Sequence, residues 1–161
     1  MNIAVIFDMD GVLVDNGAYH YQAWKLFCDK FNIPFSEKKF RTVFFGRTNE
    51  KVLTDLFDRA LMANEIEQLS LEKEQIYREI YAPHLKPVKG LLPFLDKLKA
   101  NKIPVGVATS APKENVDFVL NGLNIQKYVD FVVDDSMVSN GKPNPEIYLK
   151  AASLLNTEPK D

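Results

Sequence analysis

The first part of the chain holds a cluster of acids that could bind a metal ion or take part in phosphoryl transfer. Asp8 and Asp10 directly follow the apolar run NIAVIF, and Gly11 comes next. Carboxylates so close together repel one another. A hard cation such as Mg²⁺, which usually arrives with phosphate oxygens, would offset that repulsion. Two carboxylates in different environments can also divide the work between a nucleophile and a general acid or base.

Three structural interpretations compete with a metal or phosphate site at this acidic segment. A calcium loop of the EF-hand type needs an acid at its fifth position and glycine at its sixth, whereas here Val12 is fifth and Gly11 is fourth. The following GVLVD has no helical pattern, which argues against a helix-capping role for Asp8 or Asp10. A solvated turn remains an alternative on this segment alone.

Two later segments could supply groups that hold an anion. GVATSAP places Thr109 and Ser110 after a second apolar run, where hydroxyls and backbone amides could bind an oxyanion; Ser110 equally suits the N-cap of a helix that begins near Pro112. In NGKPNPEIY, Lys142 stands between glycine and proline, on a stiff turn that suits a fixed positive charge facing phosphate. Taken alone, Lys142 is also compatible with a solvated loop.

The elements that must position these residues alternate between buried strands and amphipathic helices. Continuous apolar runs predict strands of a parallel sheet at 2–7, 103–109 and 128–133. Helices are predicted from the apolar spacing around 91–98, from Pro112 to Leu123, and from Pro145 to Leu155 with Asn144 as N-cap. In such a sheet ligands bind at the carboxyl ends of the strands, which is where the acids, Thr109 and Lys142 fall.

A purely helical insertion is expected between the first strand and the rest of the sheet. Apolar residues at helical spacing predict four helices, at 19–31, around 40–44, at 52–61 with Thr48 as N-cap, and at 65–81. In the last helix the apolar stripe consists of Ile66, Leu69, Ile76 and Ile80. The predicted fold is therefore α/β: a doubly wound, Rossmann-like parallel sheet core at 1–15 and 87–161, with an all-helical cap domain inserted at 16–86.

Composition excludes several classes of protein. The 161 residues are 46% apolar and 26% charged, as in a folded soluble domain, and the net charge of -2 favours neither nucleic acid nor an anionic membrane as partner. No apolar run approaches the length of a membrane span, and the apolar stretch at 3–7 is too short for a secretory signal. Cys28 is the only cysteine, so we expect a cytoplasmic protein without an intrachain disulfide, and Cys28 on an apolar helix face.

Together, DMDGVLVD, the threonine that ends the second strand and GKPNPEIY resemble the haloacid dehalogenase superfamily in order and spacing. The helical insertion resembles the cap of its β-phosphoglucomutase and phosphoglycolate phosphatase branch, and the resemblance covers the whole chain. It implies an enzyme that acts on a small phosphorylated metabolite. Asp10 favours phosphate chemistry, because the dehalogenases that name the superfamily lack an acid two residues after the nucleophile.

The resemblance also implies a role for each motif residue. Asp8 would be the nucleophile that takes the phosphoryl group, and Asp10 would protonate the leaving oxygen and later deprotonate the attacking water. Thr109 and Lys142 would bind the phosphoryl oxygens. The cofactor would be Mg²⁺, held by the Asp8 carboxylate and the Asp10 carbonyl.

Residues of the helical insertion would then decide the substrate. His20 resembles a histidine of the mutase branch, whereas Trp24, one turn later, is better explained as cap core. FGRTNEKVL resembles the substrate-specificity loop, with Gly46, Arg47 and Asn49 as candidate binding residues. The sugar phosphomutases have an arginine for a second phosphate where this chain has Asn49, so a simple phosphatase is favoured and a β-phosphoglucomutase-type mutase is the alternative.

Two residues of the last cap helix have two explanations. Lys73 with Tyr77 resembles a cap pair of the mutase branch, but a lysine and a tyrosine four residues apart also suit any exposed helix. The sequence leaves the metabolite and the oligomeric state open.

The resemblance predicts a further strand after the helix that follows Lys142, carrying one or two acids that complete the Mg²⁺ site. The sequence stops at LLNTEPKD, before that strand. Our hypothesis from the sequence is therefore a fragment of a longer enzyme, expected to hold Mg²⁺ poorly and to turn over slowly if at all. A second chain supplying the strand is one alternative, and a non-catalytic interaction module that kept the fold is another.

Overall fold

The computed structural model describes residues 3–44, 47–57 and 59–155. The chain divides into two compact units. The first, here called the α/β unit, comprises residues 1–15 and 85–161, and the second, the helical unit, comprises residues 16–84. Among the described residues, none of the helices combines the length and the apolar character that crossing a bilayer requires.

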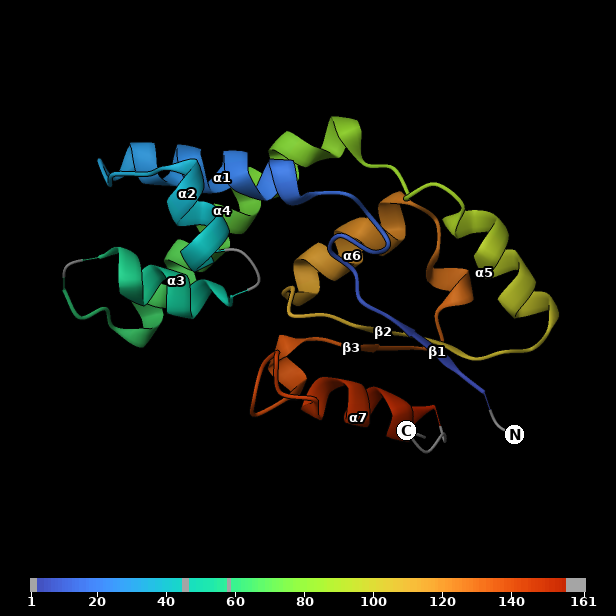
Figure 1. The fold of residues 1–161 in the computed structure, drawn as a ribbon. Helices are drawn as coiled ribbons and strands as arrows, with labels where there is room; N and C mark the ends of the chain where they lie inside the picture. The colour runs from blue at the N-terminus through green and yellow to red at the C-terminus, as the bar shows by residue number, and fades with distance from the viewer. Residues whose placement is uncertain (1–2, 45–46, 58, 156–161) are drawn as a thin grey trace. The chain divides into compact units, whose positions relative to one another are not determined.

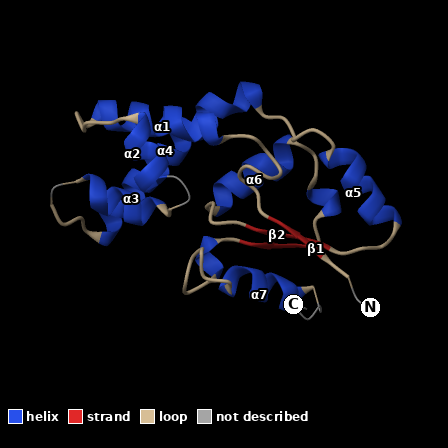
Figure 2. Ribbon diagram, in the orientation of Figure 1, coloured by secondary structure: helices blue, strands red, loops and turns tan. Residues whose placement is uncertain are grey.

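The α/β unit is built on a parallel three-stranded sheet in the order β1-β2-β3 (Figures 1 and 2). The strands are β1 (Val5–Phe7), β2 (Val105–Ala108) and β3 (Phe131–Val133). Phe7 is in register with Val107, and Val107 with Val132, so the three strands end close to the same level. Each strand is shorter than its apolar run, and Tyr128 lies in a 3₁₀ helix, Gln126–Tyr128, rather than in β3.

Helices cover both faces of the sheet, as the predicted doubly wound fold requires. Figure 1 shows α5 (Leu91–Ala100) and α6 (Lys113–Gly122) on one side and α7 (Glu146–Leu154) on the other. Successive residues of β1 point to opposite faces. Phe7 accordingly meets Phe94 of α5 edge to face, while Ile6 packs against the cluster that contains Ile147 of α7. The α/β fold with a parallel sheet is confirmed.

Helix α7 begins one residue later than the sequence predicts. Pro145, predicted as its first residue, is the N-cap instead. Asn144 still serves the helix start, because its side-chain oxygen accepts a hydrogen bond of 2.9 Å from the Glu146 N–H. The difference is a shift of the boundary and not of the capping chemistry.

In the helical unit, the described residues form helices and no strand. They are α1 (Gly17–Lys30), α2 (Glu37–Lys39), a π-helical turn (Phe40–Phe44), α3 (Asn49–Leu56), α4 (Ala63–Tyr81) and a 3₁₀ turn (Ala82–His84). Helix α3 stops earlier than predicted, since Phe57 is extended (φ -91°, ψ 129°), and Ala60 and Leu61 lie outside it. Thr48 is its N-cap residue by backbone position, without a side-chain cap hydrogen bond.

An aromatic core holds the helical unit together. It is built around Trp24, Phe27, Phe40 and Phe44, with Trp24 meeting both Phe27 and Phe44 edge to face. Trp24 is therefore core, as predicted. Cys28 is buried in the same cluster, and this burial raises the pKa of its thiol to about 11.

Candidate active site

Three strand ends meet at one edge of the sheet in the α/β unit. Asp8 directly follows β1, Thr109 follows β2, and the Thr109 N–H donates to the Val133 carbonyl at the end of β3 (3.0 Å). Parallel pairing in this register brings the residues after each strand to the same side. The acids and the threonine therefore share an edge, as the motif order predicts.

Lys142 joins the ends of β1 and β2. Its ammonium lies 2.8 Å from the Asp8 Oδ1 and donates to the Ala108 carbonyl oxygen at 3.0 Å. The aromatic ring of Tyr148 in α7 lies 5.1 Å from the same ammonium. The Lys142 side chain is only 19% exposed, so its charge is held in place and is not a solvated loop charge. The structure thus brings Asp8 and Lys142 together.

The two oxygens of the Asp8 carboxylate differ in their surroundings. Oδ1 accepts a hydrogen bond from the Met9 N–H (2.7 Å) in addition to its contact with Lys142. Among the described residues, both of these contacts fall on Oδ1. This leaves Oδ2 as the oxygen that can approach a cation or a phosphorus atom. The side chain is 33% exposed, so a ligand can reach it from solvent.

The loop after Asp8 is anchored rather than freely solvated. Met9, Leu13 and Val14 are buried, and the Met9 carbonyl accepts hydrogen bonds from the backbone of the following turn. Gly11 has φ +77°, a left-handed conformation that favours glycine, and its N–H donates to the Val14 carbonyl at 2.7 Å. Asp10, which is half-buried, is held within this turn. The segment is therefore an anchored turn with Gly11 and Val12 exposed at its tip, and its metal or phosphate role stays a prediction.

Thr109 and Ser110 differ more than the sequence suggests. Thr109 is 1% exposed, and its Oγ1 accepts a hydrogen bond from the Ala111 N–H (3.1 Å), which leaves the hydroxyl proton to be donated elsewhere. Ser110 is half-buried, and it is not the N-cap of α6, because Pro112 occupies that position. The capping alternative for Ser110 is wrong, and its binding role stays a prediction.

The donor atoms at this edge are suited to Mg²⁺. Asp8 supplies a carboxylate oxygen and Asp10 a backbone carbonyl, and Mg²⁺ prefers oxygen ligands, with one or two carboxylates and the remaining positions filled by water and phosphate. No group of three or more His, Cys, Asp or Glu side chains that could hold a metal ion occurs within the described ranges. The Asp8 carboxylate and the Asp10 carbonyl nevertheless fit the preference of Mg²⁺ for oxygen ligands.

In the helical unit, His20 belongs to a buried polar network that the sequence only partly revealed. The ring of His20 stacks on Tyr77 (3.9 Å between centroids), and its Nδ1 lies 3.1 Å from the Lys73 ammonium. Lys73 forms an ion pair of 2.8 Å with Glu74, and both are buried. The alternative of an exposed Lys73 and Tyr77 is therefore wrong. The apolar periodicity of this helix does not predict that Glu74 is buried. Its position directly after Lys73, a candidate cap residue, is the one sequence signal that could have indicated it.

The candidate substrate residues near α3 are engaged with carboxylates. Arg47 pairs with Asp55 at 2.6 Å, and the Asn49 side-chain amide donates to Glu74 Oε1 at 2.7 Å. Gly46 lies outside the described residues. Arg47 and Asn49 would therefore have to leave these carboxylates before either could bind a second phosphate.

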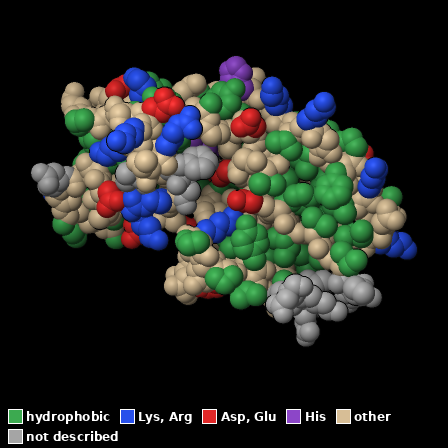
Figure 3. Space-filling model, in the orientation of Figure 1, with side chains coloured by type: hydrophobic (Ala, Val, Ile, Leu, Met, Phe, Trp, Pro, Cys, Tyr) green, Lys and Arg blue, Asp and Glu red, His purple; other side chains and the backbone are tan. Residues whose placement is uncertain are grey.

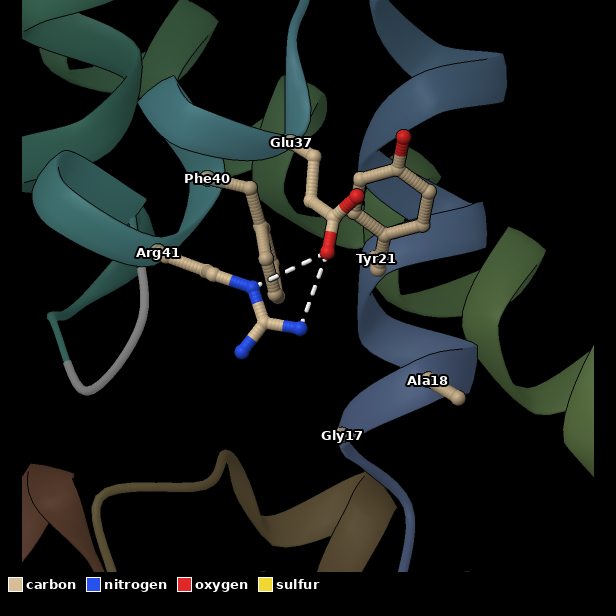
Figure 4. A pocket seen from close by; sticks show the side chains of 6 residues that line it. All are labelled: Gly17, Ala18, Tyr21, Glu37, Phe40 and Arg41. Atoms are coloured by element: carbon tan, nitrogen blue, oxygen red, sulfur yellow. Dashed lines mark hydrogen bonds and ion pairs between the residues drawn. The ribbon is translucent and has the colours of Figure 1, made fainter.

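A hollow of about 540 Å³ opens on the helical unit (Figure 4). It is lined by Gly17, Ala18, Tyr21, Glu37, Phe40 and Arg41. Figure 4 shows the Arg41 guanidinium turned toward the Glu37 carboxylate, to which it donates two hydrogen bonds (2.8 and 3.0 Å). Of the predicted site residues that the structure describes, none lines this hollow, and the sequence carried no motif that pointed to it.

Surface charge is mixed on the face shown in Figure 3. Lysine and arginine side chains are interspersed with acids and do not form one continuous patch there. This agrees with the small net charge of -2.

The family model for haloacid dehalogenase-like hydrolases matches residues 5–161. The chain belongs to this family. It is 31% identical over 157 residues to a phosphorylated carbohydrates phosphatase of Thermotoga maritima, across 98% of this chain and 72% of that protein. It is 32% identical over 167 residues to a β-phosphoglucomutase of Bacillus subtilis, again across 98% and 72%.

Solved structures agree with the family assignment. A β-phosphoglucomutase from Clostridium difficile superposes with a TM-score of 0.83 at 30% identity, covering 98% of this chain and 72% of that one. A family IA hydrolase from Entamoeba histolytica gives a TM-score of 0.86 at 28% identity, covering 96% and 71%. This haloacid dehalogenase-like chain is therefore an enzyme of the phosphatase and phosphomutase type, and the resemblance seen in its motifs is confirmed.

Proposed function

We propose that the chain is a Mg²⁺-dependent phosphatase that acts on a small phosphorylated metabolite through an aspartyl-phosphate intermediate. The observation that carries the proposal is the contact of 2.8 Å between Lys142 and Asp8 Oδ1 at the strand ends. In this arrangement the Lys142 ammonium and the Met9 N–H both hold Asp8 Oδ1, which leaves Oδ2 for attack on phosphorus. Such an arrangement suits a nucleophile better than a structural salt bridge.

In the first half of the proposed reaction, Asp8 Oδ2 attacks phosphorus and the bond to the substrate's ester oxygen breaks. Asp10 gives its proton to that leaving oxygen, so the product departs as a neutral alcohol. In the second half, Asp10 takes a proton from water as the water attacks phosphorus, and the bond to Oδ2 breaks. Inorganic phosphate leaves and both carboxyl groups return to their starting states.

The other residues at this edge would hold the phosphoryl oxygens. The Thr109 hydroxyl proton and the Lys142 ammonium are suited to donate to oxygens whose negative charge grows in the transition state. Mg²⁺, held by the Asp8 carboxylate and the Asp10 carbonyl, would neutralise part of the phosphoryl charge when bound. Lys142 would meanwhile keep the Asp8 side chain in one orientation for attack.

A phosphatase is favoured over a sugar phosphomutase by the state of Arg47 and Asn49. A mutase must bind a second phosphate while the first is transferred. Arg47 is paired with Asp55 and Asn49 with Glu74, so the candidate groups for that second phosphate are already committed to carboxylates. The name of the Thermotoga maritima relative makes phosphorylated carbohydrates the first substrates to test.

The proposal is tested by measuring phosphate release from a panel of sugar phosphates, with and without Mg²⁺. In parallel, conversion of β-glucose 1-phosphate to glucose 6-phosphate is followed as the mutase reaction. The proposal predicts Mg²⁺-dependent phosphate release without that conversion. Isomerised sugar phosphate as the main product would establish the mutase alternative instead.

A further inference from the structure

The ion pair between Lys73 and Glu74 is the most deeply buried charge pair among the described residues of the helical unit. The side chains are 2% and 6% exposed, and the Lys73 ammonium also lies 5.1 Å from the ring centroid of Trp24. Glu74 accepts hydrogen bonds from Lys73 (2.8 Å) and from Asn49 (2.7 Å). A buried carboxylate with a cation and a second donor beside it keeps its charge, and it keeps the lysine protonated in turn.

The pKa of Glu74 agrees with this geometry. Burial by itself would raise that pKa. The attraction of the Lys73 ammonium, that of His20 whenever its ring is protonated, and the hydrogen bonds from Lys73 and Asn49 outweigh burial and lower the pKa to about 2. Glu74 is therefore a carboxylate at neutral pH.

A protonated Lys73 restricts the protonation of His20. An ammonium group carries three donors and no acceptor. Its nitrogen lies 3.1 Å from His20 Nδ1, so Nδ1 must accept this hydrogen bond with its lone pair. A histidine whose Nδ1 accepts is neutral and carries its hydrogen on Nε2.

Asn16 makes the competing contact. Its Nδ2 lies 3.4 Å from His20 Nε2, and a hydrogen bond donated by Asn16 there would require the opposite tautomer. The Lys73 contact is shorter and comes from a charged donor that has no acceptor to offer. The Asn16 amide, by contrast, can turn end for end and present its oxygen to the His20 Nε2–H.

The Tyr77 hydroxyl supports the turned amide. The atom placed as Asn16 Nδ2, which also faces His20 Nε2, lies 2.7 Å from the Tyr77 hydroxyl oxygen. This distance is usual for an O–H···O bond and shorter than most N–H···O bonds. The turned amide would accept from both the Tyr77 hydroxyl and His20 Nε2. The Tyr77 hydroxyl and the His20 Nε2–H are then both donors to one amide oxygen.

We propose that the Lys73–Glu74 pair holds His20 as its neutral Nε2–H tautomer, and that Glu74 is a positioning residue that acts through Lys73. Lys73 and Tyr77 of α4 and Asn16, the N-cap residue of α1, contact the ring. Glu74 and Trp24 contact Lys73. The ring plane is fixed by stacking on Tyr77 at 5° between planes. His20 thus offers an uncharged N–H donor of set direction; only its use toward a substrate rests on the function proposed above.

The test is the two-bond ¹H–¹⁵N correlation spectrum of the ¹⁵N-histidine-labelled chain at pH 7.5, without substrate. The chain has two histidines, and His84→Gln assigns the signals of His20. The wild type should show the pattern of a single Nε2–H tautomer. In Glu74→Gln and in Lys73→Met, the two ring-nitrogen shifts should move toward each other as the Nδ1–H tautomer becomes populated.

A matched control comes from the same helix. Glu72→Gln removes a carboxylate that pairs with Lys30 on the surface, and it should leave the His20 pattern unchanged. A wild-type ring protonated at Nδ1, or both mutant spectra identical to wild type, would overturn the proposal. If Glu74→Gln does not fold, the proposal is tested by comparing the spectrum of Lys73→Met with that of the wild type. Because the resting protein is observed, loss of the proposed phosphatase function would not affect this result.

Discussion

The Lys142 ammonium lies 2.8 Å from Asp8 Oδ1 and 3.0 Å from the Ala108 carbonyl oxygen, so one side chain ties together the ends of β1 and β2. This contact offsets part of the charge of the acidic cluster and engages Oδ1 of Asp8, so that Oδ2 remains for the proposed attack on phosphorus. The chemistry proposed for this chain depends on that arrangement.

Replacing Lys142 should slow turnover much more than it weakens substrate binding. We expect Lys142→Met to lower kcat by about 10²–10³-fold, the usual effect of removing one preorganised donor to a charged transition state. Lys142→Arg should recover only part of this loss, because a planar guanidinium does not replace a compact ammonium at this contact. Steady-state kinetics and circular dichroism of each variant provide the measurement and the folding control. A Lys142→Met enzyme with wild-type kcat would contradict the role assigned to the contact.

Replacing Asp10 should make the rate depend on the leaving group. Asp10→Asn removes the proton donor, and we expect hydrolysis of sugar phosphates to fall by about 10²–10⁴-fold. Formation of the phosphoenzyme from p-nitrophenyl phosphate should fall much less, because nitrophenolate leaves without a proton. Rapid-quench measurement of the first turnover with both substrates separates the two cases. An equal loss for both would argue against Asp10 as the acid.

Replacing Arg47 should have a small effect if the substrate carries one phosphate. Arg47 is paired with Asp55, so we expect Arg47→Ala to change kcat/KM for a sugar monophosphate by less than about tenfold, which is ~1.4 kcal/mol. Lys51→Ala, which removes an exposed cation from α3, the helix that carries Asp55, is the matched control. A loss above 100-fold with Arg47→Ala alone would indicate that Arg47 leaves Asp55 to grip a phosphate, as a mutase would need.

Glu74 should contribute to the acid sensitivity of the fold. Its pKa is lowered to about 2 in the folded chain, against an ordinary value of 4.5. A group with a lowered pKa stabilises the fold above its unfolded-state value, and this contribution is lost as the pH falls from 4.5 toward 2. Urea unfolding between pH 7 and pH 3 should therefore show a shallower fall in the free energy of unfolding for Glu74→Gln than for the wild type. Parallel curves would contradict the assigned pKa shift.

The arrangement of the candidate active site could be predicted from the sequence because parallel strands end at one edge. Once NIAVIF and IPVGVAT are taken as buried neighbouring strands, Asp8 and Thr109 must lie close together. The position of Lys142 followed from its place after the third strand. The exact strand lengths did not, because hydrogen bonding and not hydrophobicity decides where pairing stops; Tyr128 continues the apolar run but lies in a 3₁₀ helix.

The polar interior of the helical unit was largely hidden from the sequence. Periodicity assigns charged residues to the solvent face of a helix, and in α4 it picked out Ile66 and Ile76, which are only partly buried. Lys73 and Glu74 are buried instead, because each neutralises the other and Asn49 and His20 complete their hydrogen bonds. Such pairing depends on residues far apart in the chain, which no local pattern contains.

The most direct test of the central claim is to trap the phosphoryl group on the protein. The chain is incubated with Mg²⁺ and a phosphodonor such as acetyl phosphate, quenched in acid, digested, and examined by mass spectrometry, with Asp8→Asn as control. The account predicts a hydroxylamine-sensitive phosphoryl group on the peptide that contains Asp8, absent from the variant. Substrate hydrolysis without any phosphorylated Asp8 peptide, or with the label on another residue, would contradict it.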